Sequence, residues 1–192
     1  MFGKKAIFVA MLLLPLLLAT SNATAEEKTT QEEKTQSMVI LACTLAMAIA
    51  GIGSAIGLSL GGISASAVTA EKPEVFSRVL ILEMLPMTQT IYAFITSVLL
   101  LLGAGLLGGK AGMNLASPTT GISSIFVGLL VGLTGLSAIN QGLIASASIT
   151  ATGRNPEVAA RGIIFAVMPE TIAIFGFLVA LLVLILGLKI FG

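Results

Sequence analysis

The sequence contains four long apolar runs, and each is long enough to cross a membrane as an α-helix. About 20 residues, rising 1.5 Å each, span the roughly 30 Å of hydrocarbon in a bilayer. Backbone groups must bond internally in lipid, and the sequence lacks the alternating strands of a membrane barrel. The chain is therefore predicted to be an all-α membrane protein with four transmembrane helices, at residues 38–70, 79–107, 121–150 and 162–190.

Composition excludes several other classes of protein. Hydrophobic residues make up 56% of the chain and charged residues 10%, which suits neither a soluble domain nor a disordered chain. The net charge of +1 indicates no nucleic-acid partner. The sequence has no His and no Asp, and Cys43 is its one cysteine. A Ser-His-Asp triad, a zinc cluster and an intramolecular disulfide are therefore excluded.

The N-terminus has the pattern of a secretory signal. Two lysines precede a short apolar run, and the small residues Ala23-Thr24-Ala25 follow it. Residues 1–25 are predicted to be a signal peptide cleaved after Ala25; the alternative is an extra, uncleaved helix. Residues 26–37 are then a polar, solvated tail on the extracytoplasmic side.

The two halves of the chain repeat each other. A shift of 83 residues aligns Pro73-Glu74-Val75 with Pro156-Glu157-Val158, Arg78 with Arg161, Pro86 with Pro169 and Phe94 with Phe177. Because each half holds two spans, both halves have the same orientation in the membrane, which makes this a parallel repeat. The sequence therefore predicts two helical hairpins, at 38–107 and 121–192, joined by an extracytoplasmic linker at 108–120.

Positive charge predicts the orientation. The two matching loops, at 71–78 and 153–161, carry Lys72, Arg78, Arg154 and Arg161, whereas the opposite side carries Lys110 and Lys189. The positive-inside rule places both loops in the cytoplasm. A cleaved signal independently places the mature N-terminus outside, so we expect both chain ends to be extracytoplasmic.

Small residues distinguish spans one and three. Gly53, Gly57 and Gly61 are four residues apart, and span three carries Gly128, Gly132 and Gly135. Such stripes allow helix backbones to approach closely. We expect these two spans to pack together as an inner layer, with the bulkier spans two and four outside them.

Only two glutamates lie within spans. Glu170 is nine residues past Arg161, which places it about 13 Å along a helix and near the middle of the membrane. Glu83 is five residues past Arg78 and lies closer to the interface. A carboxylate in hydrocarbon is costly, so it usually faces protein and has a function.

Several neutral oxygens accompany the carboxylates. Leu85, Thr88, Gln89 and Tyr92 share one face of span two, and Gln141 lies among small residues in span three. A carboxylate surrounded by carbonyl, hydroxyl, amide and phenol oxygens suits a small monovalent cation, whereas a proton needs only the carboxyl group. The alternative for each residue alone is interhelical hydrogen bonding.

The repeat restricts the number of sites. Glu170 matches Met87, which lies away from the oxygen face of span two. If the hairpins pack head to tail, Glu170 of the second hairpin meets that face of the first hairpin. At the equivalent contact between neighbouring copies, Met87 stands in the place of Glu170. One ion site per four helices is predicted. Glu83 points like Met87, so we expect it to neutralise Arg78 or to cap the vacant contact.

These residues resemble the rotor-ring proteolipid of V-type (V/A-type) ATPases, close to its sodium-translocating bacterial form. The resemblance covers residues 38–190, and its specific parts are Leu85-Pro86-x-Thr88-Gln89-x-x-Tyr92, Gln141 and Pro169-Glu170-Thr171. It implies a non-catalytic subunit that couples ion flow to ATP hydrolysis or synthesis by rotation. Glu83 and the N-terminal signal depart from the pattern.

The resemblance also implies the ligands and the partners. Sodium would be held by Glu170, Thr88, Gln89, Gln141 and the carbonyl of Leu85, with Tyr92 fixing Glu170. Copies would form a homo-oligomeric ring in the bilayer, a stator subunit would present an essential arginine, and central-stalk subunits would contact loops 71–78 and 153–161. No cofactor is expected, and the absence of a phosphate-binding loop assigns ATP chemistry to partners.

Three alternatives remain at this point. The same rotor could carry protons, against which only the extra oxygens argue. A secondary transporter with parallel repeats would need broken helices around a solute cavity. A structural or channel-forming oligomer would leave the buried Glu170 unexplained.

Overall fold

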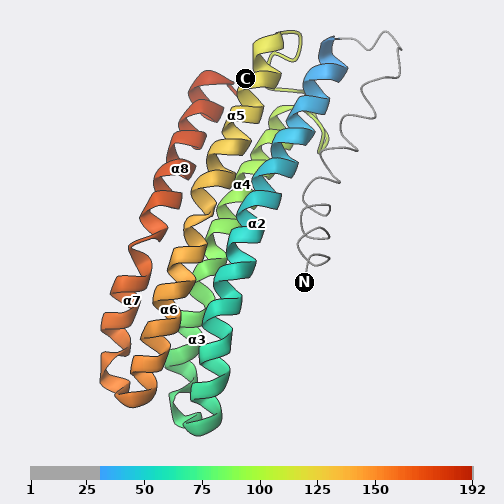
Figure 1. Ribbon diagram of the computed structural model, residues 1–192. Helices are drawn as coiled ribbons and strands as arrows, with labels where there is room; N and C mark the ends of the chain where they lie inside the picture. Colours follow the sequence, from blue (N-terminus) through green and yellow to red (C-terminus); the bar gives the residue numbers. More distant parts are fainter. Residues whose placement is uncertain (1–30, 192) are drawn as a thin grey trace, which may run out of the picture. The chain divides into compact units, whose positions relative to one another are not determined.

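The computed structural model describes residues 31–191, and all the regular elements within that range are helical (Figure 1). The first hairpin contains α2 (Gln31–Glu71), η2 (Pro73–Val75), α3 (Phe76–Met84), η3 (Leu85–Met87) and α4 (Thr88–Gly103). The second contains α5 (Pro118–Gly135), α6 (Ser137–Arg154), η4 (Pro156–Val158), α7 (Ala159–Val167), α8 (Glu170–Leu182) and η5 (Val183–Gly187). The predicted signal peptide lies outside the described residues.

The predicted four spans are confirmed within residues 31–191. Stretches long and apolar enough to cross a membrane run over Gln31–Glu71, Pro73–Gly103, Pro118–Arg154 and Glu170–Gly187. The second span ends at Gly103, four residues earlier than predicted, because Gly105 adopts a positive φ of 72° that a continuing helix does not allow. The third span is interrupted between Gly135 and Ser137, which the sequence did not predict.

The first span begins earlier than predicted. Helix α2 starts at Gln31, inside the segment expected to be a solvated tail. Thr35 is buried, and the Gln36 side chain donates a 3.4 Å hydrogen bond to the carbonyl of Ala104. Residues 31–37 therefore belong to the helical bundle, whereas Glu32 and Glu33 remain exposed on its surface.

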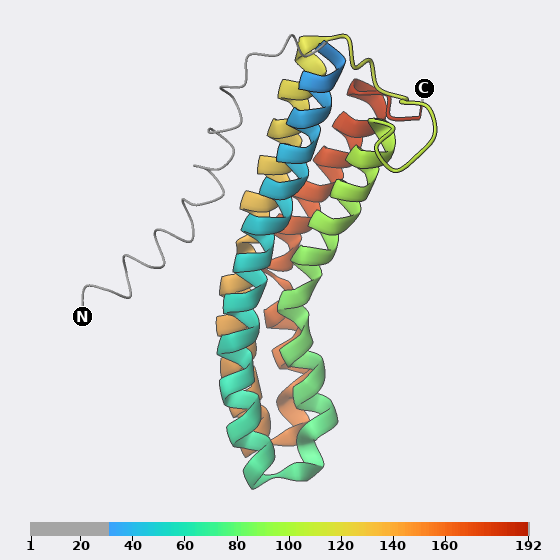
Figure 2. The same cartoon turned by 90° about the vertical axis from the view of Figure 1, so that its right-hand side faces the viewer.

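The helices form two layers. Helix α2 packs against α5 and α6, and the α3–α4 and α7–α8 arms lie together on the other side (Figure 2). Glycines make the first layer thin: a Cβ on Gly53 would lie 3.0 Å from the carbonyl oxygen of Gly135. A Cβ on Gly142 would collide with the backbone of Gly57. The predicted close packing of spans one and three is confirmed.

Both arms of the second layer break at the repeated prolines. Helix α3 ends at Met84, before Pro86, and α7 ends at Val167, before Pro169. A proline removes a backbone donor, and its ring displaces the carbonyl four residues earlier, so an α-helix cannot continue through it undisturbed. Helices α4 and α8 then start at Thr88 and Glu170, at matching depths in the two hairpins.

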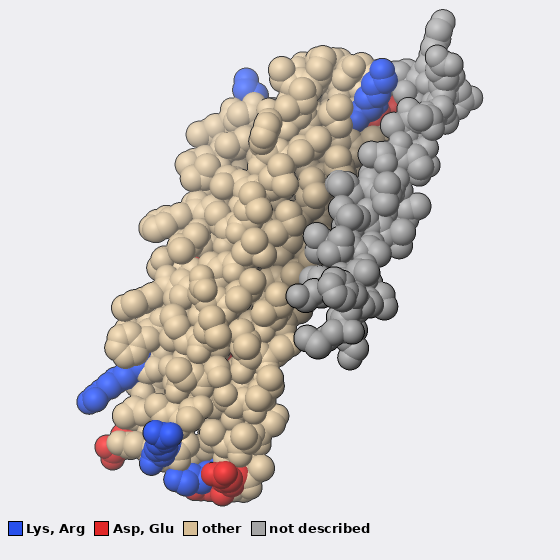
Figure 3. Space-filling view, in the orientation of Figure 1, with Lys and Arg blue, Asp and Glu red and all other residues tan. Residues whose placement is uncertain are grey.

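The matching loops lie together at one end of the bundle. Each loop enters a short 3-10 turn through a proline, and in the second loop the Asn155 side chain accepts a 3.0 Å hydrogen bond from the Glu157 amide. The start of α2 and the C-terminus lie at the opposite end (Figure 1). On the face drawn in Figure 3, charged side chains gather toward the two ends and leave a broad uncharged band between them.

Two apolar clusters fill the bundle on either side of a polar layer. One includes Val39, Ala46 and Ala93, and the other, nearer the matching loops, includes Leu82 and Ile149. Gln89 lies between Leu82 and Ala93 in sequence and is completely buried. The polar side chains discussed next are thus enclosed by apolar protein above and below.

Candidate ion-binding site

The proline break in the fourth span positions the central carboxylate. Glu170 is the first residue of α8 and follows Pro169 directly. The side chain points into the bundle and is 8% exposed. Because a helix N-terminus stabilises negative charge, this position favours a carboxylate.

Tyr92 of α4 fixes one oxygen of that carboxylate. Its hydroxyl donates a 2.8 Å hydrogen bond to Glu170 Oε1. The tyrosine ring stacks on Phe177 of α8, with centroids 5.3 Å apart and planes inclined by 18°. This role of Phe177 was not predicted from the sequence. The signal was its spacing, because a residue seven positions after Glu170 lies on the same face of α8.

Two buried glutamines reach the other side of the carboxylate. Gln141 of α6 donates a 3.3 Å hydrogen bond through Nε2 to Glu170 Oε2. Gln89 of α4 donates a 2.6 Å hydrogen bond through Nε2 to Gln141 Oε1. Both glutamine side chains are completely buried. The amides therefore connect α4, α6 and α8 in one network.

The break before α4 supplies the last two oxygens. The Thr88 hydroxyl lies 3.0 Å from the carbonyl oxygen of Leu85 and 3.3 Å from Gln89 Oε1. The Leu85 carbonyl also accepts the backbone N–H of Thr88, in the short turn that contains Pro86. Because of this turn, a main-chain oxygen lies beside the hydroxyl and amide oxygens rather than inside a regular α-helical ladder.

The structure thus brings together all six residues that were predicted to form the site. One carboxylate lies beside two amides, a hydroxyl, a phenol and a backbone carbonyl. Residues 31–191 contain no group of three or more His, Cys, Asp or Glu side chains placed to hold a metal ion. The cluster has a single negative charge to offer, so its chemistry suits a monovalent cation better than a multivalent metal.

Glu83 lies apart from this cluster. Its carboxyl group packs against the backbone of Gly61 and Gly62 in α2, and a Cβ on Gly61 would collide with Glu83 Oε2. That oxygen is buried and has no hydrogen-bond partner within residues 31–191. The expectation that Glu83 neutralises Arg78 is wrong, because the structure holds its carboxyl group against α2.

The equivalent position in the first hairpin carries no such cluster. Met87, which matches Glu170, is the last residue of η3 and is 39% exposed. Ile172, which matches Gln89, is 54% exposed on α8. The described part of the chain therefore contains one such polar cluster for its two hairpins.

Comparison with known proteins identifies the family. The chain matches the family described as the ATP synthase C subunit over residues 41–100 and 125–183, which covers most of both hairpins. The chain belongs to the ATP synthase C-subunit family. Members of this family are membrane proteolipid subunits without nucleotide chemistry of their own, so the predicted family and the predicted non-catalytic role are confirmed.

Individual relatives agree with this placement. The chain is 38% identical over 147 residues to the V-type sodium ATPase subunit K of Enterococcus hirae, a match that covers 76% of this chain and 89% of that protein. It is 37% identical over 147 residues to the A-type ATP synthase subunit K of Methanocaldococcus jannaschii, where the match covers 77% of this chain and 63% of the relative. The chain thus spans less than two thirds of the Methanocaldococcus protein.

A more distant relative is named for a different ion, the proton. The 16 kDa proteolipid of the V-type proton ATPase of Nephrops norvegicus is 26% identical over 147 residues, covering 74% of this chain and 86% of that protein. Family membership alone therefore does not identify the transported ion, which has to be inferred from the residues of the polar cluster.

Proposed function

We propose that this chain is the ion-carrying rotor subunit of a sodium-translocating V-type ATPase. The observation that carries the proposal is the convergence of Glu170, Gln141, Gln89, Thr88 and the Leu85 carbonyl in one buried network. The more similar relatives support it, because one is named a sodium ATPase subunit and the other an ATP synthase subunit.

Glu170 would alternate between two states: neutralised by a bound ion, and charged when the site is empty. With Na⁺ bound, the carboxylate and the ion neutralise each other, and the neutral oxygens replace the water that the ion loses. A neutral site can face lipid at low cost, whereas a charged empty site cannot. The Tyr92 hydroxyl and the Gln141 amide hold the carboxylate in place for each exchange.

The donor set favours sodium over a proton. A proton carrier needs only a carboxyl group, and additional buried amides and hydroxyls would then be an unnecessary desolvation cost. Here Gln89 and Gln141 are both completely buried beside the carboxylate. Proton transport by the same rotor remains the second candidate, supported by the proton-ATPase name of the Nephrops relative.

The surroundings of the rotor follow from the same assignment. Copies would assemble head to tail into a ring in the cell membrane, where a stator subunit with an essential arginine would displace the ion from each Glu170. The loops at 71–78 and 153–161 would face the cytoplasm and contact the central stalk, and both chain ends would lie outside. Introduced cysteines at Lys110 and Lys72, labelled from either side of intact vesicles, test that orientation.

Carbodiimide labelling tests the ion site directly. A carbodiimide modifies a protonated carboxyl group in an apolar environment, so bound Na⁺ should slow the modification of Glu170 in the assembled complex. Labelling slowed by Na⁺ but not by K⁺ supports the sodium assignment. Labelling that responds to pH and not to Na⁺ would replace it with the proton rotor.

Two glutamate variants complete the test. Glu170→Gln should abolish ion transport and ion-coupled ATP hydrolysis, because the neutral amide cannot alternate between charged and neutralised states. The matched variant Glu83→Gln, at the other glutamate within a span, should continue to transport. Transport by the Glu170→Gln complex would exclude the proposed mechanism.

A further inference from the structure

Glu83 is an acid within a membrane span that the proposed ion cycle does not use. It lies on α3, two residues before Leu85, whose carbonyl oxygen belongs to the polar cluster. One oxygen of its carboxyl group, Oε2, is buried and has no hydrogen-bond partner within residues 31–191. A buried polar atom without a partner lowers stability. Its presence here therefore indicates a role other than stabilising the fold.

Two glycines of α2 form the place in which this carboxyl group lies. A Cβ built on Gly61 would collide with Glu83 Oε2, and a Cβ built on Gly62 would lie 3.2 Å from Oε1. The three atoms nearest to the Cβ position of Gly61 all belong to Glu83. A side chain at position 61 would therefore displace the carboxyl group.

A second contact with α2 lies on the other side of Leu85. The Pro86 ring packs against Gly57, where a built Cβ would lie 2.8 Å from the Cβ of Pro86. Gly57 and Gly61 are four residues apart, so they lie on the same face of α2, one turn apart. The segment from Glu83 to Pro86 is thus held against one helix at two points, and the Leu85 carbonyl lies between them.

The second hairpin lacks the carboxyl contact. The repeat matches Glu83 with Ala166 and Gly61 with Ile144. The short side chain of Ala166 has no polar group to place on α6, and Ile144 leaves no bare backbone to receive one. The arm formed by α7 is therefore not held to α6 by a carboxyl group.

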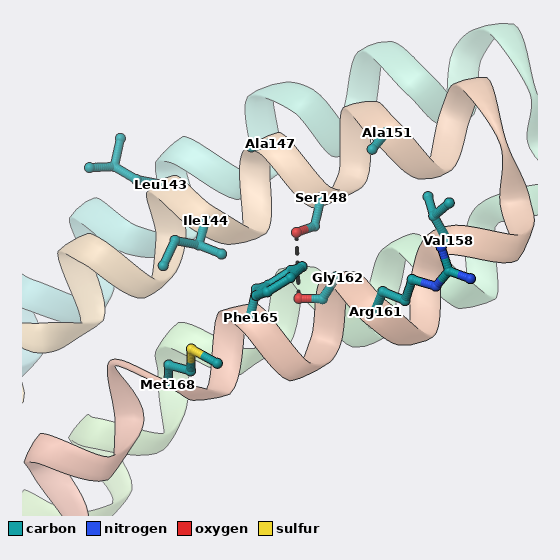
Figure 4. Close-up of a pocket in the computed structure, with 10 residues that line it drawn as sticks. All are labelled: Leu143, Ile144, Ala147, Ser148, Ala151, Val158, Arg161, Gly162, Phe165 and Met168. Carbon is teal, nitrogen blue, oxygen red and sulfur yellow. Dashed lines mark hydrogen bonds between the residues drawn. The ribbon is translucent and has the colours of Figure 1, made fainter.

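An open groove between α6 and α7 shows the difference (Figure 4). It has a volume of about 710 Å³, and its lining includes Ile144 and Met168. Met168 matches Leu85, and its carbonyl accepts a 2.7 Å hydrogen bond from the Thr171 hydroxyl, outside the polar cluster. The carboxyl contact thus occurs in the hairpin whose turn supplies a carbonyl oxygen to the cluster, and it is missing from the other hairpin.

We infer that Glu83 is a positioning residue for the ion site: its contact with the two glycines of α2 holds the end of α3 in place and thereby fixes the Leu85 carbonyl oxygen. A main-chain oxygen moves only with its backbone, so the contacts on either side of Leu85 determine where it lies. Ligands in a binding site must be held within about 0.5 Å of their working geometry. The inference rests on the proposed sodium site, and it adds a residue that does not itself touch the ion.

Sodium protection of Glu170 in the assembled complex tests this role. Mass spectrometry of the peptide that contains Glu170 separates its carbodiimide modification from that of Glu83. Glu83→Ala should raise the sodium concentration that halves the modification rate about tenfold, an effect typical of residues that orient metal ligands. Glu83→Gln has the same length and fills the same place, so its half-protecting concentration should stay near that of the original chain.

Val79→Ala is the matched control for a loss of packing alone. Val79 is buried on the same face of α3, one turn before Glu83, and it packs in the apolar cluster that includes Leu82. Truncation of this side chain leaves a cavity, so it should lower the midpoint of thermal unfolding in detergent. Sodium protection of Glu170 should remain unchanged in this variant.

A double variant tests the contact itself. Gly61→Ala places a methyl group where the carboxyl group lies, so it should weaken sodium protection in the same way as Glu83→Ala. In the chain that carries both substitutions, the methyl group occupies space that the carboxyl group has left. The combined effect, on a logarithmic scale, should therefore be clearly smaller than the sum of the two single effects. Additive effects would show that the two residues act independently, which contradicts the inference.

The single variants separate this inference from the proposed function. A rise in Glu83→Ala, with Glu83→Gln and Val79→Ala near the original chain, supports the positioning role. Unchanged protection in Glu83→Ala, or a rise of equal size in either of the other two variants, overturns that role and leaves the sodium site standing. Absence of sodium protection in the original chain would overturn both.

Discussion

The hydroxyl of Tyr92 donates a 2.8 Å hydrogen bond to Glu170 Oε1 and thereby joins α4 of the first hairpin to α8 of the second. The central carboxylate of the cluster is thus fixed by a residue of the other half of the repeat. Neither hairpin holds the complete cluster, so doubling the hairpin within one chain assembles the site without a second copy.

Tyr92→Phe should weaken sodium binding without unfolding the bundle. The ring can keep its stack on Phe177, while the hydrogen bond to the carboxylate is lost. A bond to a charged group contributes about 1.5–3 kcal/mol, so the sodium concentration that protects Glu170 from carbodiimide should rise at least tenfold. Phe177→Leu provides the comparison, since it keeps the hydroxyl and removes the stacked ring. Unchanged protection in Tyr92→Phe would contradict the role given to the hydroxyl.

The double variant Thr88→Ala, Gln89→Ala should lose sodium dependence and keep a modifiable carboxyl group. It removes the hydroxyl and the amide that flank the Leu85 carbonyl, and it leaves Glu170 with Tyr92 and Gln141. Carbodiimide labelling across sodium concentrations would measure the effect. Thr171→Ala is the matched control, because this exposed threonine occupies the position equivalent to Thr88 in the second hairpin. A double variant with the protection of the original chain would exclude sodium ligation by these two residues.

Gly142→Leu should destabilise the first layer. Even a Cβ at this position collides with the backbone of Gly57, so a leucine must separate α2 from α6. Overpacking of this kind costs about 1–3 kcal/mol, which should lower the midpoint of thermal unfolding in detergent. Gly51→Leu is the control on the same layer, because no atom lies within 4 Å of a Cβ built there. Equal midpoints for the two variants would contradict the close contact.

Charge reversal in both loops should uncouple ATP hydrolysis from transport. Glu74→Lys with Glu157→Lys changes exposed side chains far from the polar cluster. Sodium protection of Glu170 should therefore be unchanged, while ATP-driven transport falls. If transport persists at the original rate, these carboxylates are not part of the stalk contact.

Hydrophobic runs, helical periodicity and the repeat were sufficient to predict the four spans and the polar cluster. The repeat was decisive for placing Glu170. It matches Glu170 to Met87, on the side of the helix away from the oxygens of span two, so packing of one hairpin on the next was predicted to bring Glu170 to those oxygens. The break between Gly135 and Ser137 was not predictable in the same way, since no proline marks it and it lies where α5 crosses close to Ala50 and Gly53.

Contacts between distant segments explain the remaining misses. The polar composition of residues 31–37 concealed a helix that packs on the loop after Gly103, where the Ala104 carbonyl accepts a bond from Gln36. Glu83 has Arg78 nearby in sequence, but its carboxyl group packs against Gly61 and Gly62 of another helix. Helical periodicity describes one helix at a time and does not show which backbone a long side chain will meet.

The presence of Met87 at the position that matches Glu170 has an energetic consequence for the proposed rotor. In a ring of such chains, the number of ions moved per revolution equals the number of copies and is half the number of outer helices. Each ion then receives a larger share of the free energy that one revolution releases. If the chain is the proposed rotor subunit, a complex built from such copies would move fewer ions for each ATP and would work against, or draw on, a steeper ion gradient.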